Sequence, residues 1–330
     1  MTAMLTDSIY LAQALAPIDC FLARGDVTDL YINQPGELWV ETLGGAIERH
    51  DVTPLTGILL ERMASQIAAR TNQGISRASP LLAAVLPDGA RVQVIGPSAT
   101  RGAMAIAVRK HQASGLTLDD YVAADAFADI ENGADDVTLF ATLNSLRSKG
   151  AFGALLRLAV QNRCNIMIAG GTSTGKTTFL NALLREIDGH ERLILIEDTP
   201  ELAITHANSV GLLAARGELG EAQVDMNDLL TAALRMRPDR IILGELRGPE
   251  ALTFLRAVNT GHPGSMTTIH ADSPARAIEQ LTLLVLQTGT RLAREDVVHY
   301  VRSTVDVFVQ VARKAGRRYV SNIALRDSKD

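Results

Sequence analysis

The chain has 330 residues, of which 47% are apolar and 21% are charged. This length favours two domains, and the apolar share supplies a sizeable core and excludes a disordered chain. The net charge of −5 is uneven, because residues 1–135 hold 9 Lys/Arg and 16 Asp/Glu whereas residues 136–330 hold 23 and 21. An acidic first part argues against a dedicated nucleic-acid binder, so we expect no stable nucleic-acid binding.

The only two cysteines, Cys20 and Cys164, lie far apart and form no C-x-x-C pair, which excludes the usual zinc and redox motifs. This cysteine usage fits a reducing compartment. No apolar run reaches the roughly 20 residues that a membrane-spanning helix needs, and no export signal is visible at the N-terminus. We therefore expect a cytoplasmic protein, attached at most to a membrane surface.

The first part of the chain shows apolar side chains at helical spacing, and Pro17 predicts a break or a new helix start within them. A β-rich stretch follows, in which the turn Gln34-Pro35-Gly36 predicts a hairpin. These patterns predict a smaller α+β domain over residues 1–113. Its expected elements are strands at Asp29–Asn33, Leu38–Thr42 and Ala46–His50, a helix at Leu55–Thr71, and strands at Arg91–Ile95 and Ala103–Arg109.

Residues 114–149 are not Gly/Ser-rich, and their apolar pattern predicts an ordered linker with short helices. Over residues 150–330, apolar β-like runs alternate with helical segments. This alternation is typical of an α/β fold with a mainly parallel sheet and helices on both faces. The expected strands are Ile166–Ala169, Leu193–Ile196, Arg240–Gly244 and Met266–His270, followed by an edge hairpin formed by Val305–Val311 and Tyr319–Ala324.

The run Gly170–Thr178 contains Gly-x-x-x-x-Gly-Lys-Thr, the P-loop or Walker A pattern, between an apolar strand and the helical segment Thr178–Glu186. Strand, Gly-rich turn and helix start in this order predict a cradle of backbone N–H groups for nucleotide phosphates. Lys176 is expected to reach the β- and γ-phosphates, and the Thr177 hydroxyl to bind Mg²⁺. The alternative is a chance match, which this context disfavours. The predicted phosphate-binding residues are Gly170, Gly171, Thr172, Ser173, Thr174, Gly175, Lys176, Thr177 and Thr178.

Acidic residues follow two of the predicted strands, at the edge where ligands bind in an open α/β sheet. Glu245 comes after Ile241–Leu243 and Gly244, where a Walker B acid is expected to hold the Mg²⁺ shell and to orient or deprotonate the attacking water. Glu197 and Asp198 end another apolar run and are predicted to bind Mg²⁺ through water or to place the nucleophile. The alternatives are a surface acid at Glu245 and a helix cap at Asp198.

Two histidines and several arginines complete the set of candidate residues. His262 and His270 bracket a Gly/Pro turn and a short strand, and they are either core residues or sensors of the γ-phosphate, with His270 the stronger candidate. Their spacing, without a third ligand, makes a poor metal site. Arg91, Arg101 and Arg109 lie on or beside the last strands of the first domain. Most of these arginines are expected to form structural ion pairs, and one or two of them, with Arg91 and Arg109 as the candidates, are expected to contact nucleotide.

Together, these segments resemble the secretion traffic ATPases, the motors of type II secretion, type IV pili and type IV secretion. That family carries a Walker A motif, an acidic "Asp box", a Walker B motif ending in Gly-Glu-Leu-Arg and a "His box". The first domain, including Pro80–Gln93, is most similar to the type IV secretion (VirB/Trb) branch. Two cysteines exclude the four-Cys zinc insertion of type II secretion, and the C-terminal motif of pilus retraction motors is absent. The four motifs correspond here to Gly170–Thr178, Arg192–Leu202, Arg240–Arg247 and Gly261–Ala271.

The resemblance implies a RecA-like P-loop ATPase domain that uses ATP and Mg²⁺ and forms a ring-shaped homohexamer at the cytoplasmic face of the inner membrane. Its implied function is to power type IV secretion, through pilus biogenesis or translocation of DNA or protein. The implied partners are inner-membrane components of the secretion machine, including the coupling protein.

Three alternatives belong to other functional classes or branches. The closest is an assembly ATPase of a type IV pilus or of type II secretion. A hexameric DNA helicase is opposed by the acidic first domain. A nucleotide-gated scaffold without turnover is opposed by the intact Lys176 and Glu245.

Overall fold

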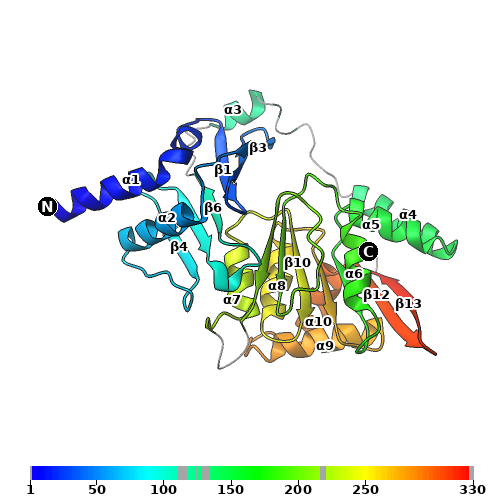
Figure 1. Cartoon of the computed structure of the whole chain (residues 1–330). Coiled ribbons are helices and arrows are strands. Elements are labelled where there is room, and N and C mark those ends of the chain that lie inside the picture. The colour runs from blue at the N-terminus through cyan, green and yellow to red at the C-terminus, as the bar shows by residue number, and fades with distance from the viewer. Residues whose placement is uncertain are drawn as a thin grey trace.

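A computed structural model describes residues 2–110, 117–123, 125, 127, 134–215 and 221–326 of the chain. Two β-sheets lie next to each other, and each packs against its own helices (Figure 1). The first sheet belongs to the N-terminal part, and the second forms the centre of the larger C-terminal part. Every helix of this described region is too short or too polar to cross a lipid bilayer.

The N-terminal sheet has six antiparallel strands in the order β3-β2-β1-β6-β5-β4. Helices α1 (Thr2–Leu22) and α2 (Gly57–Arg70) pack together and bury their apolar residues in the same core as this sheet. The predicted α+β arrangement is therefore observed, with β4 added at the edge. The strands are β1 (Val27–Ile32), β2 (Glu37–Thr42), β3 (Ile47–Asp51), β4 (Leu81–Val85), β5 (Arg91–Ile95) and β6 (Ala105–Arg109).

Helix α1 continues through Pro17, so the predicted helix break at this residue is wrong. Proline removes the hydrogen bond to the carbonyl of Gln13 and usually kinks or ends a helix. Ala14 and Ile18, on either side of Pro17, are both fully buried in the N-terminal core. This burial keeps the turn helical despite the lost hydrogen bond.

The C-terminal sheet has the order β13-β12-β7-β11-β10-β8-β9, and every strand is parallel to its neighbours except β13, which forms a hairpin with β12. The predicted parallel sheet and edge hairpin are confirmed. Strand β9 was not predicted, because it is short and contains Gly211 at its centre. The strands are β7 (Ile166–Ala169), β8 (Leu193–Glu197), β9 (Ser209–Leu213), β10 (Arg240–Leu246), β11 (Met266–Ile269), β12 (Val307–Lys314) and β13 (Arg317–Leu325).

Helices cover both faces of this sheet, as predicted, because successive side chains of a strand point to opposite faces. Ile166 and Ile168 of β7 belong to one core, and Met167 and Ala169 belong to the other. The first core is covered by α4 (Ala134–Ser148), α5 (Phe152–Gln161) and α6 (Lys176–Leu184), and the second by α7 (Met226–Ala233), α8 (Glu250–Asn259), α9 (Pro274–Leu286) and α10 (Arg294–Thr304).

The segment predicted as a linker contains the short helix α3 (Leu118–Ala123) and all of α4 (Figure 1). Residues 111–116, 124, 126 and 128–133 lie outside the described residues. The domain boundaries after residues 113 and 149 therefore stay a prediction.

The N-terminal part packs along β9, the edge strand of the C-terminal sheet. Asn33 donates a side-chain hydrogen bond to Asn208 at 3.0 Å, and the Arg101 backbone N–H donates to the Gly211 carbonyl at 2.8 Å. The fully buried Arg192 places its guanidinium 4.0 Å from the centre of the Tyr31 ring. A sheet edge that would otherwise expose unpaired backbone groups is therefore covered by the same chain.

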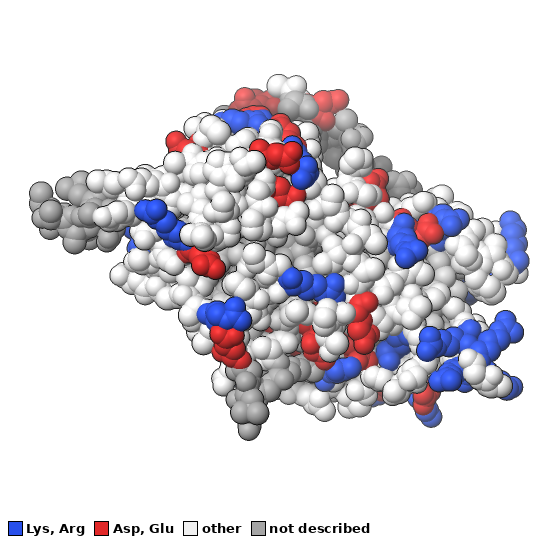
Figure 2. Space-filling model, in the orientation of Figure 1, with Lys and Arg blue, Asp and Glu red and all other residues white. Residues whose placement is uncertain are grey.

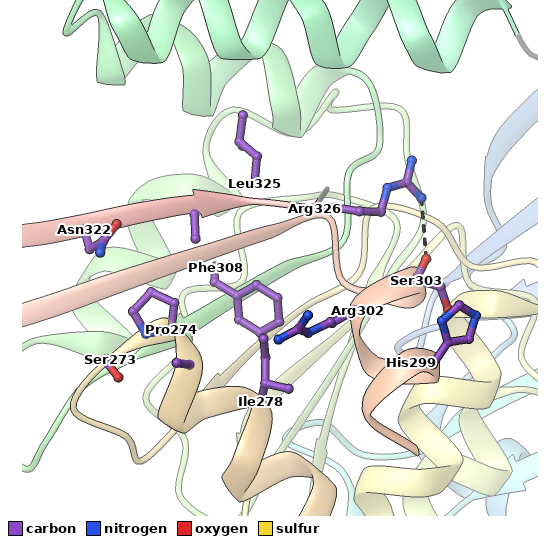
Figure 3. A pocket seen from close by; sticks show the side chains of 12 residues that line it. Ser273, Pro274, Ile278, His299, Arg302, Ser303, Phe308, Asn322, Leu325 and Arg326 are labelled. Atoms are coloured by element: carbon purple, nitrogen blue, oxygen red, sulfur yellow. Dashed lines mark hydrogen bonds between the residues drawn. The ribbon is translucent and has the colours of Figure 1, made fainter. Parts of the chain in front are cut away.

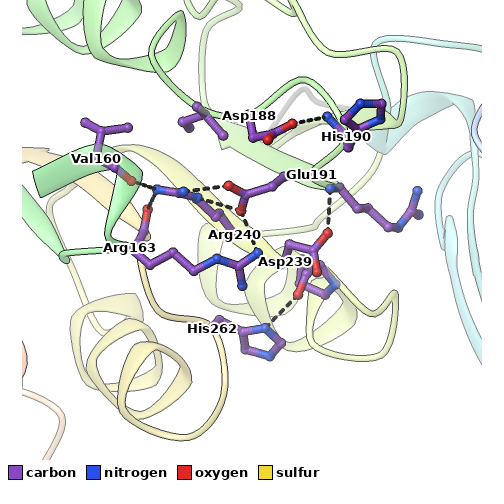
Figure 4. Close-up of polar contacts among 12 residues, drawn as sticks. Val160, Arg163, Asp188, His190, Glu191, Asp239, Arg240 and His262 are labelled. Carbon is purple, nitrogen blue, oxygen red and sulfur yellow. Dashed lines mark hydrogen bonds and ion pairs between the residues drawn. The ribbon is translucent and has the colours of Figure 1, made fainter. Parts of the chain in front are cut away.

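A buried ion pair joins the amino ends of β8 and β10 (Figure 4). Arg240 binds Glu191 through two nitrogens, with Nε–Oε2 and Nη2–Oε1 distances of 2.8 and 2.6 Å. Arg240 also donates to the Val160 carbonyl at 2.9 Å, and Arg163 lies 3.1 Å from Glu191. Such a bidentate ion pair fixes the geometry of the two strands and of the end of α5. Removing one partner would leave a buried charge unpaired.

His262 lies at this same end of the sheet and provides a pH-dependent test of the fold. Its Nδ1 is 2.9 Å from the Pro238 carbonyl, and burial lowers the pKa of His262. A histidine with a lowered folded pKa contributes its full stability above the unfolded pKa of about 6.5 and loses it as the pH falls. Between about pH 7.5 and about pH 5.5, we therefore expect the free energy of unfolding to fall less in His262→Gln than in the wild-type protein.

Urea denaturation across this pH range measures the effect, with His190→Gln, a change at an exposed histidine, as the matched control. In the control, the free energy of unfolding should depend on pH as steeply as in the wild-type protein. An identical slope for the wild-type and His262→Gln proteins would contradict the prediction.

Candidate functional site

The predicted phosphate loop connects β7 directly to α6, as the P-loop pattern requires. A Cβ atom at Gly170 would lie 2.5 Å from Thr174 Oγ1 and 2.7 Å from Val311 Cγ2, so only glycine fits there. The Thr174 hydroxyl donates to the Gly171 carbonyl at 2.8 Å and fixes the turn. The first backbone N–H groups of α6 have no acceptor within their own helix, so they are suited to bind an anion.

A cleft of about 260 Å³ lies beside this loop, at the carboxyl ends of the parallel strands. Residues from all four sequence motifs line it, although these motifs are separated by up to about 100 residues. This gathering follows from the sheet, because the carboxyl ends of parallel strands meet at one edge. The lining residues are Thr172, Ser173, Lys176, Thr177, Glu197, Asp198, Thr199, Glu201, Gly244, Glu245, Arg247, Thr268 and His270.

Glu245 is the central carboxylate of the cleft, and its side chain is 12% exposed. Its Oε1 lies 2.9 Å from His270 Nε2 and 3.5 Å from Lys176 Nζ, but neither contact is an aligned hydrogen bond. Its Oε2 accepts a hydrogen bond from Arg247 Nε at 2.6 Å. Glu245 therefore has one oxygen fully engaged and one buried oxygen available for a better-aligned partner, such as a water or a cation shell.

Lys176 and Arg247 bring positive charge to the two sides of Glu245. Burial lowers the pKa of Lys176, while the neighbouring Glu245 acts in the opposite direction. Arg247 binds Glu245 and also donates to Asp198 at 2.7 Å, so it bridges the two acids. The cleft is thus lined by paired charges that a polyphosphate and a divalent cation could rearrange.

The predicted metal ligands Thr177, Asp198 and Glu245 all line this cleft. Within the described residues, no group of three or more His, Cys, Asp or Glu side chains forms a protein-only metal site. Mg²⁺ commonly takes one or two protein oxygens together with phosphate oxygens and water. The Thr177 hydroxyl and the carboxylates of Asp198 and Glu245, of which Glu245 has one unaligned oxygen, fit such a shared site.

Glu197 is placed differently from the other acids. Its carboxylate is 3% exposed, and its Oε1 accepts hydrogen bonds from the backbone N–H groups of Glu201 and Leu202 at 2.9 and 2.7 Å. Its Oε2 forms an ion pair with Arg101, which also donates to the Leu202 carbonyl at 2.7 Å. These contacts make Glu197 a buried support of the cleft wall. Sequence reasoning did not single out Arg101 among the nearby arginines, because only tertiary packing distinguishes it.

The two histidines are separated by the strand they flank. His270 follows β11, lines the cleft and is 45% exposed, with its ring nitrogens 3.4 and 3.5 Å from Lys176 Nζ. His262 precedes β11 and contacts the Pro238 carbonyl at the opposite end of the strand. Only His270 is therefore positioned to contact a phosphate held by this loop.

Arg91 and Arg109 do not line the P-loop cleft of their own chain. They face each other across β5 and β6 and line a separate cavity of about 550 Å³. Leu234 and Arg235, which follow α7, line the same cavity. Because Arg235 precedes β10 while the phosphate loop follows β7, this cavity lies toward the other end of the sheet. Arg91 and Arg109 therefore lie away from the phosphate loop of their own chain in this structure.

A cavity larger than the P-loop cleft, of about 660 Å³, lies between α9, α10 and the β12–β13 hairpin (Figure 3). Phe308 and Ile278 point into it, and Arg302 and His299 lie on its α10 side. It contains none of the phosphate-loop or acidic motif residues. Size alone therefore does not identify the nucleotide site, which is recognised by its convergent polar groups.

Comparisons with known proteins agree with this geometry. Residues 135–321 match the family model described as "Type II/IV secretion system protein". The type IV secretion system protein VirB11 of Bartonella henselae is 36% identical over 94% of this chain and 91% of its own length. PtlH of Bordetella pertussis is 39% identical over 96% of this chain and 94% of its own length.

The fold also matches a solved structure over nearly its full length. The crystal structure of the VirB11 ATPase from the Brucella suis type IV secretion system, in complex with sulphate, has a TM-score of 0.90 and 33% identity. The match covers 98% of this chain and 97% of that one. From the family model and from relatives that align over almost all of its length, we conclude that the chain belongs to the type II/IV secretion system protein family.

Proposed function

We propose that this chain is an ATP-hydrolysing motor of a bacterial type IV secretion system, converting ATP and water to ADP and phosphate. The observation that carries the proposal is the single cleft where Lys176 of the phosphate loop meets Glu245 and His270. Relatives named VirB11 and PtlH, both type IV secretion system proteins, align with nearly the whole chain.

Nucleotide binding would rearrange the ion pairs that now line the cleft. Phosphate oxygens compete with Glu245 for Lys176, which then stabilises the charge that develops on the γ-phosphate. Released from Lys176, Glu245 can accept a hydrogen bond from the attacking water and act as its general base. Arg247 now binds Glu245 and Asp198, and after nucleotide binding it could either keep these two partners or bind the phosphates.

Thr177 would hold Mg²⁺ directly, and Asp198 and Glu245 would hold it through water. When bound, Mg²⁺ would neutralise charge on the β- and γ-phosphates. Glu197 would act on the reaction indirectly, by fixing the backbone of Glu201 and Leu202 in the segment that follows Asp198. This positional role is the one its buried contacts favour over direct catalysis.

A closed homohexamer at the inner membrane, working with the coupling protein and other membrane components, is the assembly we propose for this motor. Closed rings are built from one repeated heterologous contact, so a residue of one subunit can complete the site of the next. The cavity that holds Arg91 and Arg109 supports this arrangement, because it presents arginines away from the cleft of their own chain. Gain and loss of the γ-phosphate would then be sensed across each contact.

Substitutions of Lys176 and Glu245 separate binding from catalysis. Lys176→Ala should weaken ATP binding at least about tenfold, because it removes a charged phosphate donor. Glu245→Gln should still bind ATP but lower turnover about 10²- to 10⁴-fold, because the amide keeps the shape and loses the base. Both are measured by phosphate release and by calorimetric ATP binding. Near-normal turnover of either variant would contradict the proposed function.

His270→Ala tests the proposed phosphate sensor. Its ring contacts Glu245 and Lys176 but is half exposed, so the fold should not depend on it. We expect turnover to fall about tenfold or more while the affinity for ATP changes little. A matched change at exposed His299, in the separate cavity of Figure 3, should leave both values unchanged. Loss of folded protein as the main effect of His270→Ala would assign the residue a structural role.

Mixing two inactive proteins tests whether Arg109 acts on a neighbour. At equal amounts of Lys176→Ala and Arg109→Ala subunits, about a quarter of the ring contacts would pair an intact phosphate loop with an intact arginine. Action between subunits therefore predicts that up to about a quarter of the wild-type turnover returns on mixing. Action within one chain predicts no return. Full activity of Arg109→Ala alone would remove this arginine from the reaction.

A further inference from the structure

The phosphate loop separates the catalytic cleft from a second, smaller cavity. The cleft lies on the side of Lys176 and Thr177, whereas the second cavity, of about 230 Å³, is lined by Gly175, Thr178 and Phe179. With the catalytic acids on the first side, the γ-phosphate of a bound nucleotide must face that side. The second cavity, on the other side of the loop, then offers room for the nucleoside end.

The β12–β13 hairpin forms the far wall of this second cavity. Val311 of β12 and Arg318 and Val320 of β13 line it opposite α6. Arg318 and Val320 are two residues apart on one strand, so they lie on the same face, and Val320 pairs with Val311. The cavity is thus a largely apolar slot with one planar guanidinium, which suits the ring face of a nucleobase.

Arg318 is exposed and lies beside Gly175 of the phosphate loop. Its Cδ atom would lie 3.1 Å from a Cβ placed on Gly175, and Gly175 has a φ of +95°. Glycine is therefore needed at this position both for the left-handed backbone and for the approach of Arg318. No carboxylate lines this cavity among the described residues, so the guanidinium plane has no acidic partner there.

The charges of the hairpin also favour a ligand. Arg313 faces Arg318 across the strands, and Lys314 faces Arg317. Like charges directly opposite each other destabilise a hairpin, and the salt bridges of the described residues include none of these four side chains. Basic side chains gather at the same end of the molecule in Figure 2 as the hairpin in Figure 1. A bound nucleotide would relieve part of this repulsion.

We infer that Arg318 is the base-recognition residue of the nucleotide site and stacks its guanidinium on the ring of ATP. This inference rests on the proposed function and extends it from the phosphates to the base. Arg318 contacts the face of the base and not its edge, so this contact should raise the affinity for purine nucleotides as a class. The β12–β13 hairpin is then a part of the nucleotide site and not only the edge of a sheet.

Comparing ATP with inorganic tripolyphosphate isolates the base contact. Tripolyphosphate carries the same phosphates without the nucleoside, so a stacking residue should affect only ATP. We expect Arg318→Ala to lower the affinity for ATP and ADP about tenfold or more, within the range for one stacked base. The affinity for tripolyphosphate should fall by less than about threefold, through the lost charge alone.

Arg317→Ala is the matched control, because it removes the same charge one residue away and on the other face of the strand. It should lower the affinities for ATP and tripolyphosphate equally and only slightly. Arg318→Lys keeps the charge but loses the plane, so it should bind tripolyphosphate like the wild type and ATP like Arg318→Ala. Calorimetric titration of the full-length chain measures all of these affinities.

Three outcomes would overturn the inference. Equal losses for ATP and tripolyphosphate in Arg318→Ala would make Arg318 a phosphate contact. Wild-type ATP affinity in Arg318→Ala would remove the residue from the site. A wild-type chain that binds neither ATP nor tripolyphosphate would instead overturn the proposed function, and the inference with it.

Discussion

Three side chains that can carry positive charge, Lys176, Arg247 and His270, gather around the one carboxylate of Glu245. In a partly buried cleft, charges of one sign persist only where the other sign compensates them. Glu245 therefore holds the phosphate-binding groups in place before any nucleotide arrives. Its contacts link side chains from the phosphate loop, from the Walker B strand and from the residue that follows β11. A polyphosphate is the natural competitor, since it offers the same charge to the same cations.

The parallel sheet separates two tasks along the length of its strands. At the carboxyl ends, paired charges line a cleft in which one buried oxygen of Glu245 has no aligned partner, so these groups can exchange partners. At the amino ends, the Arg240–Glu191 pair and the buried Arg192 are held by several short contacts. The contacts at the amino ends of the strands fix the geometry that the cleft at the carboxyl ends requires, because a reacting group misplaced by about 1 Å loses much of its effect.

Most of the C-terminal architecture could be predicted from the sequence, because buried parallel strands are continuous apolar runs and the P-loop has a fixed strand–loop–helix context. The grouping of Lys176, Asp198, Glu245 and His270 followed from the same rule about strand ends. Strand β9 and the contact of Arg101 with Glu197 could not be predicted, since both depend on packing between distant parts of the chain. The continuous helix through Pro17 shows the same limit, because burial there overrides a local preference.

Strand β8 is attached to the N-terminal part at both of its ends. Its first residue follows Arg192, which contacts Tyr31 and Asn33, and its last residue is Glu197, which is paired with Arg101. Between these attachments the strand is only five residues long, and it cannot stretch or bend appreciably. Glu197, the last residue of the strand, is next to Asp198 in the cleft. β8 therefore links the wall of the cleft to the N-terminal sheet, and a movement of this strand would be transmitted to that sheet.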